Sequence, residues 1–134
     1  MTHPALQPGS VAIVTGGASG IGLAIAKRFA REGASVMVSA NEDAGATVEA
    51  IRSQGGRAES FTADVTDKDQ VVALYDAAER AFGGVDILVN NAGIASRGRA
   101  VADTDAAELE RVIRTHALAP HQLSRLVLPS MRAR

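Results

Sequence analysis

The sequence predicts an α/β fold in which helices cover both faces of a doubly wound parallel sheet. Short apolar runs alternate along the chain with segments whose apolar residues recur at helical spacing, which is typical of right-handed β-α-β units. A glycine-rich turn separates the first strand from the first helix. Only 3% of the 134 residues are aromatic, so aliphatic side chains would fill the layers of a single domain.

The composition argues against several classes of protein. With 46% hydrophobic residues, 22% charged residues and a formal net charge of -1, the chain has neither a disordered nor a nucleic-acid-binding balance. It has no cysteine, which suits a reducing compartment, and we expect a cytoplasmic protein. No apolar run approaches the ~20 residues that a membrane helix needs, so we expect neither a membrane nor a nucleic-acid partner.

The expected elements follow one another in regular order. Residues 1–9 contain two prolines and a glycine and are expected to form a flexible leader, while residues 10–134 form the folded domain. We expect strands at residues 11–14, 35–39, 58–62 and 85–89, and helices at about 21–32, 44–53, 67–82 and 105–131. Gly33 follows the first helix, where a left-handed cap is easy, and Thr66 or Asp67 offers a cap for the third. Pro120 is expected to bend the last helix.

The sequence TGGASGIG at residues 15–22 carries the clearest chemical signal. It lies where a strand becomes a helix, and there a phosphate meets free backbone N–H groups and the positive end of the helix dipole. Gly16 would allow the tight turn, Gly20 would let the backbone approach a pyrophosphate, and Gly22 would permit close packing of helix on strand. A turn that needs glycine only for its geometry is the alternative. A phosphate loop for nucleoside triphosphates does not fit, because no Gly-Lys-Ser/Thr ending follows.

Three motifs in order resemble the short-chain dehydrogenase/reductase family. They are TGGASGIG at residues 15–22, ADV at 63–65 after the third strand, and NNAG at 90–93 after the fourth. The resemblance implies a partial Rossmann-like, NAD(P)-binding domain with strand order 3-2-1-4. It also implies descent from an NAD(P)-dependent oxidoreductase that acts on an alcohol or a carbonyl group.

The resemblance implies cofactor-binding residues at the carboxyl ends of the strands, where open parallel sheets bind ligands. The residues that would hold the pyrophosphate and adjacent ribose are Gly16, Ser19, Gly20, Ile21 and Gly22; those that would face the adenine are Asp64 and Val65; those that would border the nicotinamide-side ribose are Asn90, Asn91, Ala92 and Gly93. Alternatively, Asp64 is an ordinary loop or capping residue and Asn90 chiefly pins the sheet. The choice between NAD and NADP stays open, because Ala40 and Asn41 follow the second strand instead of an acidic or a basic residue.

The family's catalytic side chains cannot be assigned in this chain. The resemblance implies a Ser, a Tyr and a Lys four residues after the Tyr, but the only tyrosine is Tyr75 and Glu79 stands four residues after it. We therefore predict no catalytic residue, and we expect a truncated chain that is inactive alone. His116 stands where the family usually has Asn, either in a proton relay or as a polar helix residue. His116 and His121 are five residues apart without a suitable acidic partner, so no metal site is predicted.

Beyond the dinucleotide, we expect homo-association through the C-terminal helix or through the fourth strand, which would be an exposed edge. A non-catalytic dinucleotide-binding or interaction module and a truncated gene product remain alternatives. A Rossmann-like methyltransferase is disfavoured, because Ala40 stands where its second strand would end in an acid.

Overall fold

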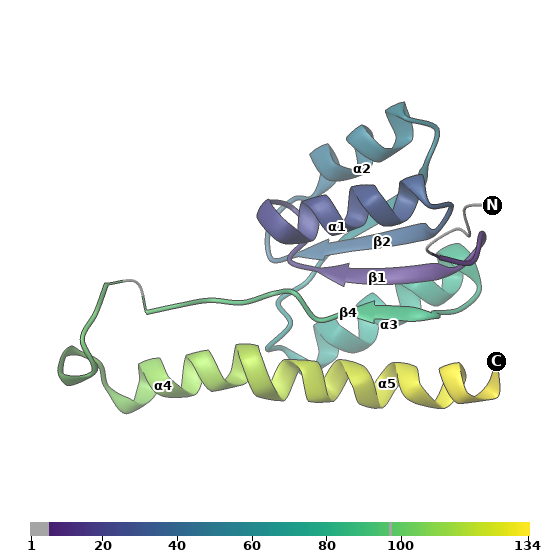
Figure 1. The fold of residues 1–134 in the computed structure, drawn as a ribbon. Coiled ribbons are helices and arrows are strands. Elements are labelled where there is room, and N and C mark those ends of the chain that lie inside the picture. The colour runs from purple at the N-terminus through teal and green to yellow at the C-terminus, as the bar shows by residue number, and fades with distance from the viewer. Residues whose placement is uncertain (1–5, 97) are drawn as a thin grey trace.

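The fold is built on a parallel sheet with the strand order β3-β2-β1-β4, as expected. The computed structural model describes residues 6–96 and 98–134. The strands are β1 (Val11–Thr15), β2 (Ser35–Ala40), β3 (Arg57–Thr62) and β4 (Ile87–Val89). In the register of the sheet, Ala12 of β1 lies opposite Val36 of β2 on one side and Ile87 of β4 on the other. The carboxyl ends of the strands therefore meet at one edge of the sheet (Figure 1).

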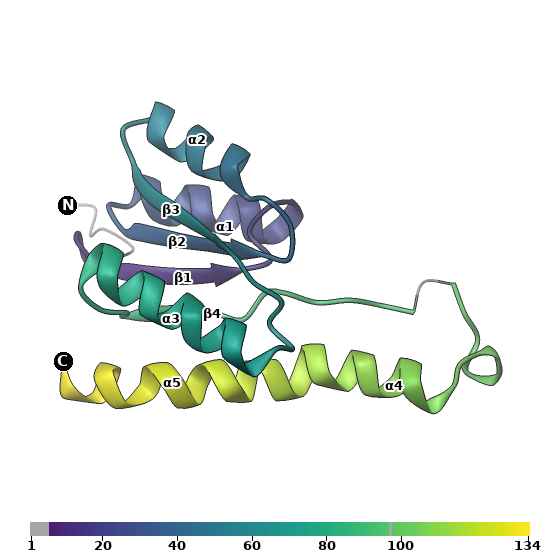
Figure 2. The same ribbon diagram turned by 180° about the vertical axis from the view of Figure 1, so that it is seen from behind.

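Helices form a layer on each face of this sheet. The helices are α1 (Gly20–Arg31), α2 (Gly45–Ser53), α3 (Lys68–Phe82), α4 (Ala106–Ile113) and α5 (Ala119–Ala133), with a short 3-10 helix at Val101–Asp103. Helices α1 and α2 cover one face, and α3 and α5 cover the other, which Figure 2 shows from behind. Within the described residues, no helix is long and apolar enough to cross a membrane.

Each face of the sheet has its own apolar core. Val14 and Val38 point to the α1–α2 side, whereas Ile13 and Met37 point to the α3–α5 side, where they pack with Leu74 of α3. All residues of β1 and β2 are buried, because both of their faces are covered by helices. Consecutive residues of the central strands thus serve opposite layers.

Local signals in the sequence explain most helix ends. Of the two predicted caps of α3, Asp67 is the one used, and its carboxylate accepts the N–H groups of Asp69 and Gln70. Gly33 has a φ of 95° and Gly83 a φ of 84°, the left-handed conformation that glycine adopts without strain. The predicted glycine cap after α1 is therefore confirmed.

The fourth strand is shorter than the predicted 85–89. The residues just before it do not pair as a regular strand. A carboxylate oxygen of Asp86 accepts the N–H of Val11 at 2.9 Å, where a backbone carbonyl would accept it in a regular ladder. The N–H of Asp86 in turn donates to the carbonyl of Val11 at 2.8 Å. One backbone bond and one side-chain bond thus connect β1 to Asp86, just before β4 begins.

The long final helix is divided into three segments instead of one bent helix. Residues Arg114–Leu118 form a π-helical turn between α4 and α5. Pro120 has no N–H to donate, and its ring opposes the carbonyl four residues earlier, so the ordinary helical ladder cannot continue through it. The wider turn takes up this conflict, and the three segments still follow one line in Figure 1.

The expected leader lies partly outside the described residues, which begin at Leu6. Leu6 packs against the core on the α1–α2 side. The N–H of Gly9 donates to the carbonyl of Gly33 at 3.1 Å, which joins this segment to the cap of α1.

Candidate functional site

A cleft of about 920 Å³ lies at the carboxyl ends of the strands. Its walls come from the turn after β1, from the loops after β2, β3 and β4, and from Arg111 and Thr115. This volume is within the range of small-molecule and cofactor sites. A smaller groove of about 370 Å³ between α1 and α2 has no wall residue in common with it and lies away from the glycine-rich turn.

The amino end of α1 opens into this cleft. Ser19 is the N-cap residue and its side chain makes no capping hydrogen bond, so the side chain leaves the first N–H groups of α1 unsatisfied. Gly16 and Gly20 have φ values of 66° and 56°, which bend the backbone around the opening. Unsatisfied N–H groups and the helix dipole together suit an anion such as a diphosphate.

Gly22 lies behind this opening, where backbone segments are in close contact. A Cβ atom at this position would lie 2.2 Å from the carbonyl oxygen of Gly16 and 2.5 Å from the side-chain nitrogen of Asn91. Helix α1 therefore approaches its neighbours closely at Gly22, as predicted, but the atoms it meets belong to the glycine-rich turn and to Asn91 instead of a strand.

The hydroxyl group of Thr15 joins the turn to the loop that follows β4. Its oxygen accepts the N–H groups of Asn91 at 3.1 Å and Ala92 at 3.0 Å. The side-chain amide of Asn91 donates to the carbonyls of Thr15 and Gly16 at 3.0 and 3.2 Å. Thr15 itself is buried at the end of β1. Two walls of the cleft are thus fixed to each other.

Most residues that the motifs suggested lie on the cleft wall. These are Gly16, Ser19, Gly20, Ile21, Asp64, Val65, Asn91, Ala92 and Gly93. Gly22 is buried behind the wall, and Asn90 is exposed outside it in the described part of the chain. One carboxylate oxygen of Asp64 accepts the N–H and the hydroxyl of Thr66 at 2.9 and 2.7 Å. Asp64 therefore also orders the loop that leads into α3.

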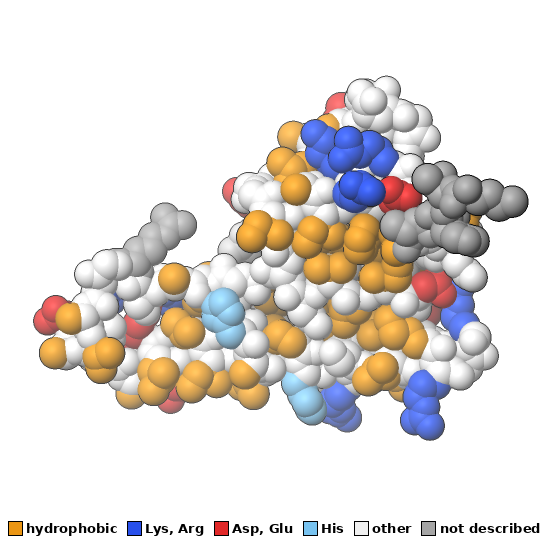
Figure 3. Space-filling view, viewed as in Figure 1, with side chains coloured by type: hydrophobic (Ala, Val, Ile, Leu, Met, Phe, Trp, Pro, Cys, Tyr) orange, Lys and Arg blue, Asp and Glu red, His pale blue; other side chains and the backbone are white. Residues whose placement is uncertain are grey.

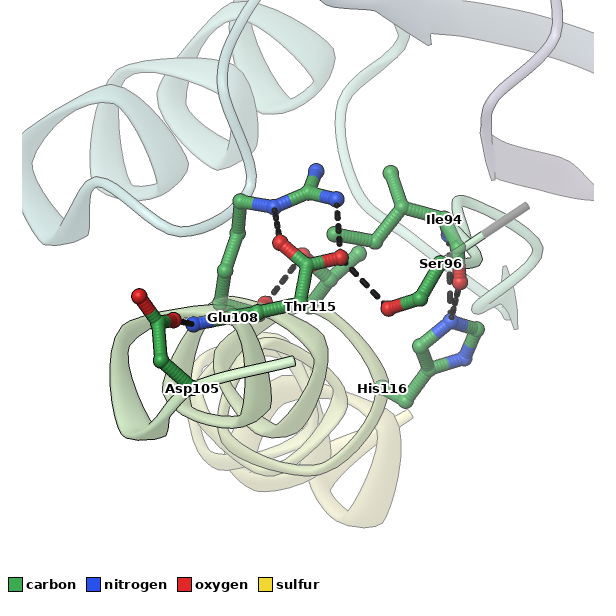
Figure 4. A network of polar contacts seen from close by, with 7 residues as sticks. Ile94, Ser96, Asp105, Glu108, Thr115 and His116 are labelled. Atoms are coloured by element: carbon green, nitrogen blue, oxygen red, sulfur yellow. Dashed lines mark hydrogen bonds and ion pairs between the residues drawn. The ribbon is translucent and has the colours of Figure 1, made fainter. Parts of the chain in front are cut away.

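Polar side chains of α4 join this helix to the loop after β4, and Arg111 among them lines the cleft (Figure 4). Arg111 donates from two nitrogens to the carboxylate of Glu108, at 3.1 and 2.9 Å. The hydroxyl of Ser96 donates to the same carboxylate at 2.5 Å. These hydrogen bonds lower the pKa of Glu108 from 4.5 to about 2. The bond from Arg111 has the larger effect, and the bond from Ser96 comes second.

His116 contacts the same loop from the π-helical turn, as Figure 4 shows. Its Nε2 atom lies 3.0 Å from the N–H nitrogen and 2.6 Å from the carbonyl oxygen of Ile94. A single ring nitrogen either accepts from the first or donates to the second, depending on the tautomer. The ring also occupies the space beside Gly93, where a Cβ atom would lie 2.7 Å from it. His116 therefore links the loop to the helix in either tautomer.

Tyr75 is part of a structural contact between two helices. Its hydroxyl donates to Glu79 at 2.5 Å and lies 3.2 Å from the hydroxyl of Ser130 on α5. The hydrogen bond to Glu79 is the main cause that raises the pKa of Tyr75. A raised pKa is unfavourable for a general acid or base near neutral pH, and Tyr75 is not among the residues of the cleft wall. Within the described residues, no cluster of three His, Asp or Glu could hold a metal ion.

The structure adds wall residues outside the motifs, of which Thr66 and Ile94 directly follow two of the motifs and three others lie farther away. Glu42 follows the end of β2, and Arg111 and Thr115 approach from α4 and the π-helical turn. Glu42 had a local signal, since it lies two residues beyond the strand. Arg111 and Thr115 had none, because only the course of the chain after β4 brings them to the cleft.

Comparison with known proteins places these motifs in one family. A profile of the family described as short chain dehydrogenase matches residues 10–134. The short chain dehydrogenase/reductase dpchG of Colletotrichum higginsianum is 38% identical over 128 residues, 92% of this chain and 47% of that protein. The uncharacterized oxidoreductase YxbG of Bacillus subtilis is 41% identical over 122 residues, 90% of this chain and 45% of that protein. The chain spans about half the length of these curated relatives.

A solved structure agrees with the sequence relatives. A metagenomic short-chain oxidoreductase, crystallised in complex with NADP, is similar with a TM-score of 0.88 and 36% identity. The similarity covers 94% of this chain and 58% of that one. The order of the strands and the placement of the helices are thus shared with a member of the same family.

Replacing Gly22 with Ala should destabilise the protein, although Ala normally stabilises a helix interior by roughly 0.5–1 kcal/mol relative to Gly. The added methyl group would meet the carbonyl of Gly16, and overpacking of this kind costs about 1–3 kcal/mol. Urea denaturation measures the free energy of unfolding. As a control, Ala24→Gly at an exposed site of the same helix should lose roughly 0.5–1 kcal/mol by ordinary helix propensity. A stabilised Gly22→Ala variant would show that the close approach is absent.

The Glu108–Arg111 contact should stabilise the fold above pH 4.5 and lose this effect as the pH falls toward 2. The reason is that a carboxyl group whose pKa is lower in the folded state favours folding only while it is ionised. Unfolding curves of the wild type and Glu108→Gln should therefore differ above pH 4.5 and converge toward pH 2. The matched change Glu110→Gln, exposed on the same helix, should show no such convergence. A titration of the Glu108 carboxyl carbon by NMR with a midpoint near 4.5 would contradict the assignment.

Proposed function

Because the chain belongs to the short-chain dehydrogenase family, we propose that residues 10–134 form the dinucleotide-binding part of an oxidoreductase. The cofactor is NAD or NADP. The reaction is the transfer of a hydride between the nicotinamide ring and an alcohol or carbonyl group. The observation that carries the proposal is the uncapped amino end of α1, which opens into a cleft of cofactor size.

The backbone of the glycine-rich turn would hold the pyrophosphate. The N–H groups of Gly20, Ile21 and Gly22 belong to the first turn of α1, and the hydroxyl of Ser19 has no capping bond that would compete. Gly20 has open space where a Cβ atom would stand, so a ligand can approach its backbone closely. The fixed geometry of these groups lets them bind an anion without first giving up other partners.

The remaining wall residues would contact the cofactor in two groups, one at the adenine end and one at the nicotinamide end. By the family pattern, Asp64 and Val65 face the adenine, and Asn91 to Gly93 border the ribose on the nicotinamide side. The hydrogen bonds from Asn91 and Ala92 to Thr15 support this division, since they hold the second group beside the glycine-rich turn. His116 acts as a positioning residue for that loop through Ile94.

Hydride transfer also requires an acid or base beside the substrate. The bound cofactor supplies the hydride donor or acceptor, and these 134 residues contribute its binding site. Their one tyrosine is bonded to Glu79 and lies away from the cleft. We therefore assign no catalytic side chain and expect cofactor binding without turnover by these residues alone.

The exposed apolar side chains of α4 and α5 support association between copies of the chain. Leu109, Ile113, Leu118 and Leu128 are each between 44% and 60% exposed. Figure 3 shows hydrophobic side chains along this side of the long helix. Burial of such a surface stabilises protein contacts, and the edge of β4 offers unpaired backbone groups as a second site. The molar mass in solution tests the assignment.

The purified chain should bind NADH or NADPH saturably and melt at a higher temperature in its presence. A ligand at 100 times its dissociation constant stabilises the native state by about 2.7 kcal/mol. Nicotinamide fluorescence gives the dissociation constant, and thermal unfolding gives the stabilisation. A folded, monodisperse sample that binds neither cofactor would contradict the proposal.

Two glycine variants locate the binding site. Gly20 and Gly55 both have positive φ values and open space for a Cβ atom, but only Gly20 lies on the cleft wall. Changing either to Ala should cost a similar 1–2 kcal/mol or so of backbone strain. Only Gly20→Ala should weaken cofactor binding, by at least tenfold. Equal binding by the two variants would place the cofactor elsewhere.

The same samples should show no cofactor-dependent turnover with a panel of alcohols and ketones. The physical reason is that the one tyrosine is bonded to Glu79 away from the cleft, and that the wall carboxylates of Glu42 and Asp64 belong to the part assigned to the adenine end of the cofactor. Absorbance at the nicotinamide band measures the reaction, with a commercial dehydrogenase as the positive control. Measurable turnover would reopen the search for a catalytic side chain, beginning with His116, which contacts the wall residue Ile94.

A further inference from the structure

We propose that the cleft selects NAD(H) over NADP(H), and that Glu42 makes this selection. The inference rests on the proposed cofactor-binding function and adds the identity of the cofactor. Family membership alone does not decide it, since the solved relative described above was crystallised with NADP.

The end of β2 stands beside the turn that would hold the pyrophosphate. The N–H of Gly17 donates to the carbonyl of Ser39 at 3.0 Å. The hydroxyl of Thr47 on α2 donates to the carbonyl of Gly17 at 2.9 Å, in a buried contact. The turn is therefore bonded to the end of β2 through the N–H of Gly17 and to α2 through the carbonyl of Gly17. The ribose that follows the pyrophosphate in a bound dinucleotide lies next to such a strand end.

Glu42 is the acidic group available at that position. Ala40, Asn41 and Glu42 all belong to the cleft wall, and β2 itself ends at Ala40. The neighbouring Asp43 is occupied, because its carboxylate accepts the N–H of Gly45 at 2.7 Å at the start of α2. The carboxylate of Glu42 is exposed and has no hydrogen bond or ion pair in the described part of the chain. It is therefore free to accept hydrogen bonds from ribose hydroxyl groups.

The cleft offers little to a phosphate on the 2′-oxygen. Such a group carries about -1.5 to -2 charges at pH 7 and needs Lys or Arg beside it. Arg111 is the one basic residue of the described wall, and it belongs to α4 and is paired with Glu108 through two nitrogens. Near the end of β2 the wall residues are Ala40, Asn41 and the anionic Glu42. A 2′-phosphate would thus meet a like charge where it needs an opposite one.

The test compares dissociation constants for NADH and NADPH in the wild type, Glu42→Gln and Glu49→Gln. Glu49 is exposed on α2 and is not part of the cleft wall, so it controls for the loss of one negative charge. The wild type and Glu49→Gln should bind NADH at least tenfold more tightly than NADPH. In Glu42→Gln this preference should shrink severalfold, because NADH loses a hydrogen-bond acceptor and NADPH loses a repulsive charge. Thermal unfolding of all three proteins without cofactor shows that the variants are folded.

The outcomes separate this inference from the proposed function. Equal or tighter binding of NADPH by the wild type would overturn the selection while leaving the dinucleotide site intact. An unchanged preference in Glu42→Gln would overturn the role of Glu42. Binding of neither cofactor by the folded wild type would overturn the proposed function and this inference with it.

Discussion

One buried hydroxyl group, on Thr15, holds the cleft in shape. It lies at the end of the central strand β1 and accepts two N–H groups from the loop after β4. Strand β4 has only three residues. The two bonds therefore extend the connection between β1 and β4 past the end of their backbone ladder. Only a side chain with a short acceptor can serve here, and the branched Thr also fits a strand. The amide of Asn91 then fixes the turn from the opposite direction.

The walls of the cleft carry more carboxylates than cations. Glu42 and Asp64 face it, and its one described cation, Arg111, is already paired with Glu108. Attraction of a diphosphate therefore depends on peptide N–H groups at the start of α1, which act over short distances and require the correct geometry. Three of the four glycines in residues 15–22 provide that geometry. Gly16 and Gly20 bend the backbone, whereas Gly22 lets α1 approach it.

The sequence predicted the alternation of elements, the strand order and most of the cleft wall, because these depend on short motifs at strand ends. It did not predict the start of β4, where the side chain of Asp86 takes the place of a backbone partner. It placed Pro120 as a bend but did not indicate how the helix would accommodate it. Residue spacing could not predict that Arg111 and Thr115 line the cleft or that His116 contacts Ile94. These positions depend on where the long loop after β4 places the helix that follows it.

The π-helical turn at Arg114–Leu118 determines which way the last helix faces. One additional residue in a helical turn rotates everything after it by about 100° relative to an uninterrupted α-helix. With that rotation, Leu123 and Val127 of α5 point into the core, while Thr115 lines the cleft and His116 contacts Ile94 on the loop after β4. The length of this segment, more than its composition, keeps the two ends of the helix in phase. Adding or removing one residue in this segment would therefore turn Leu123 and Val127 away from the core.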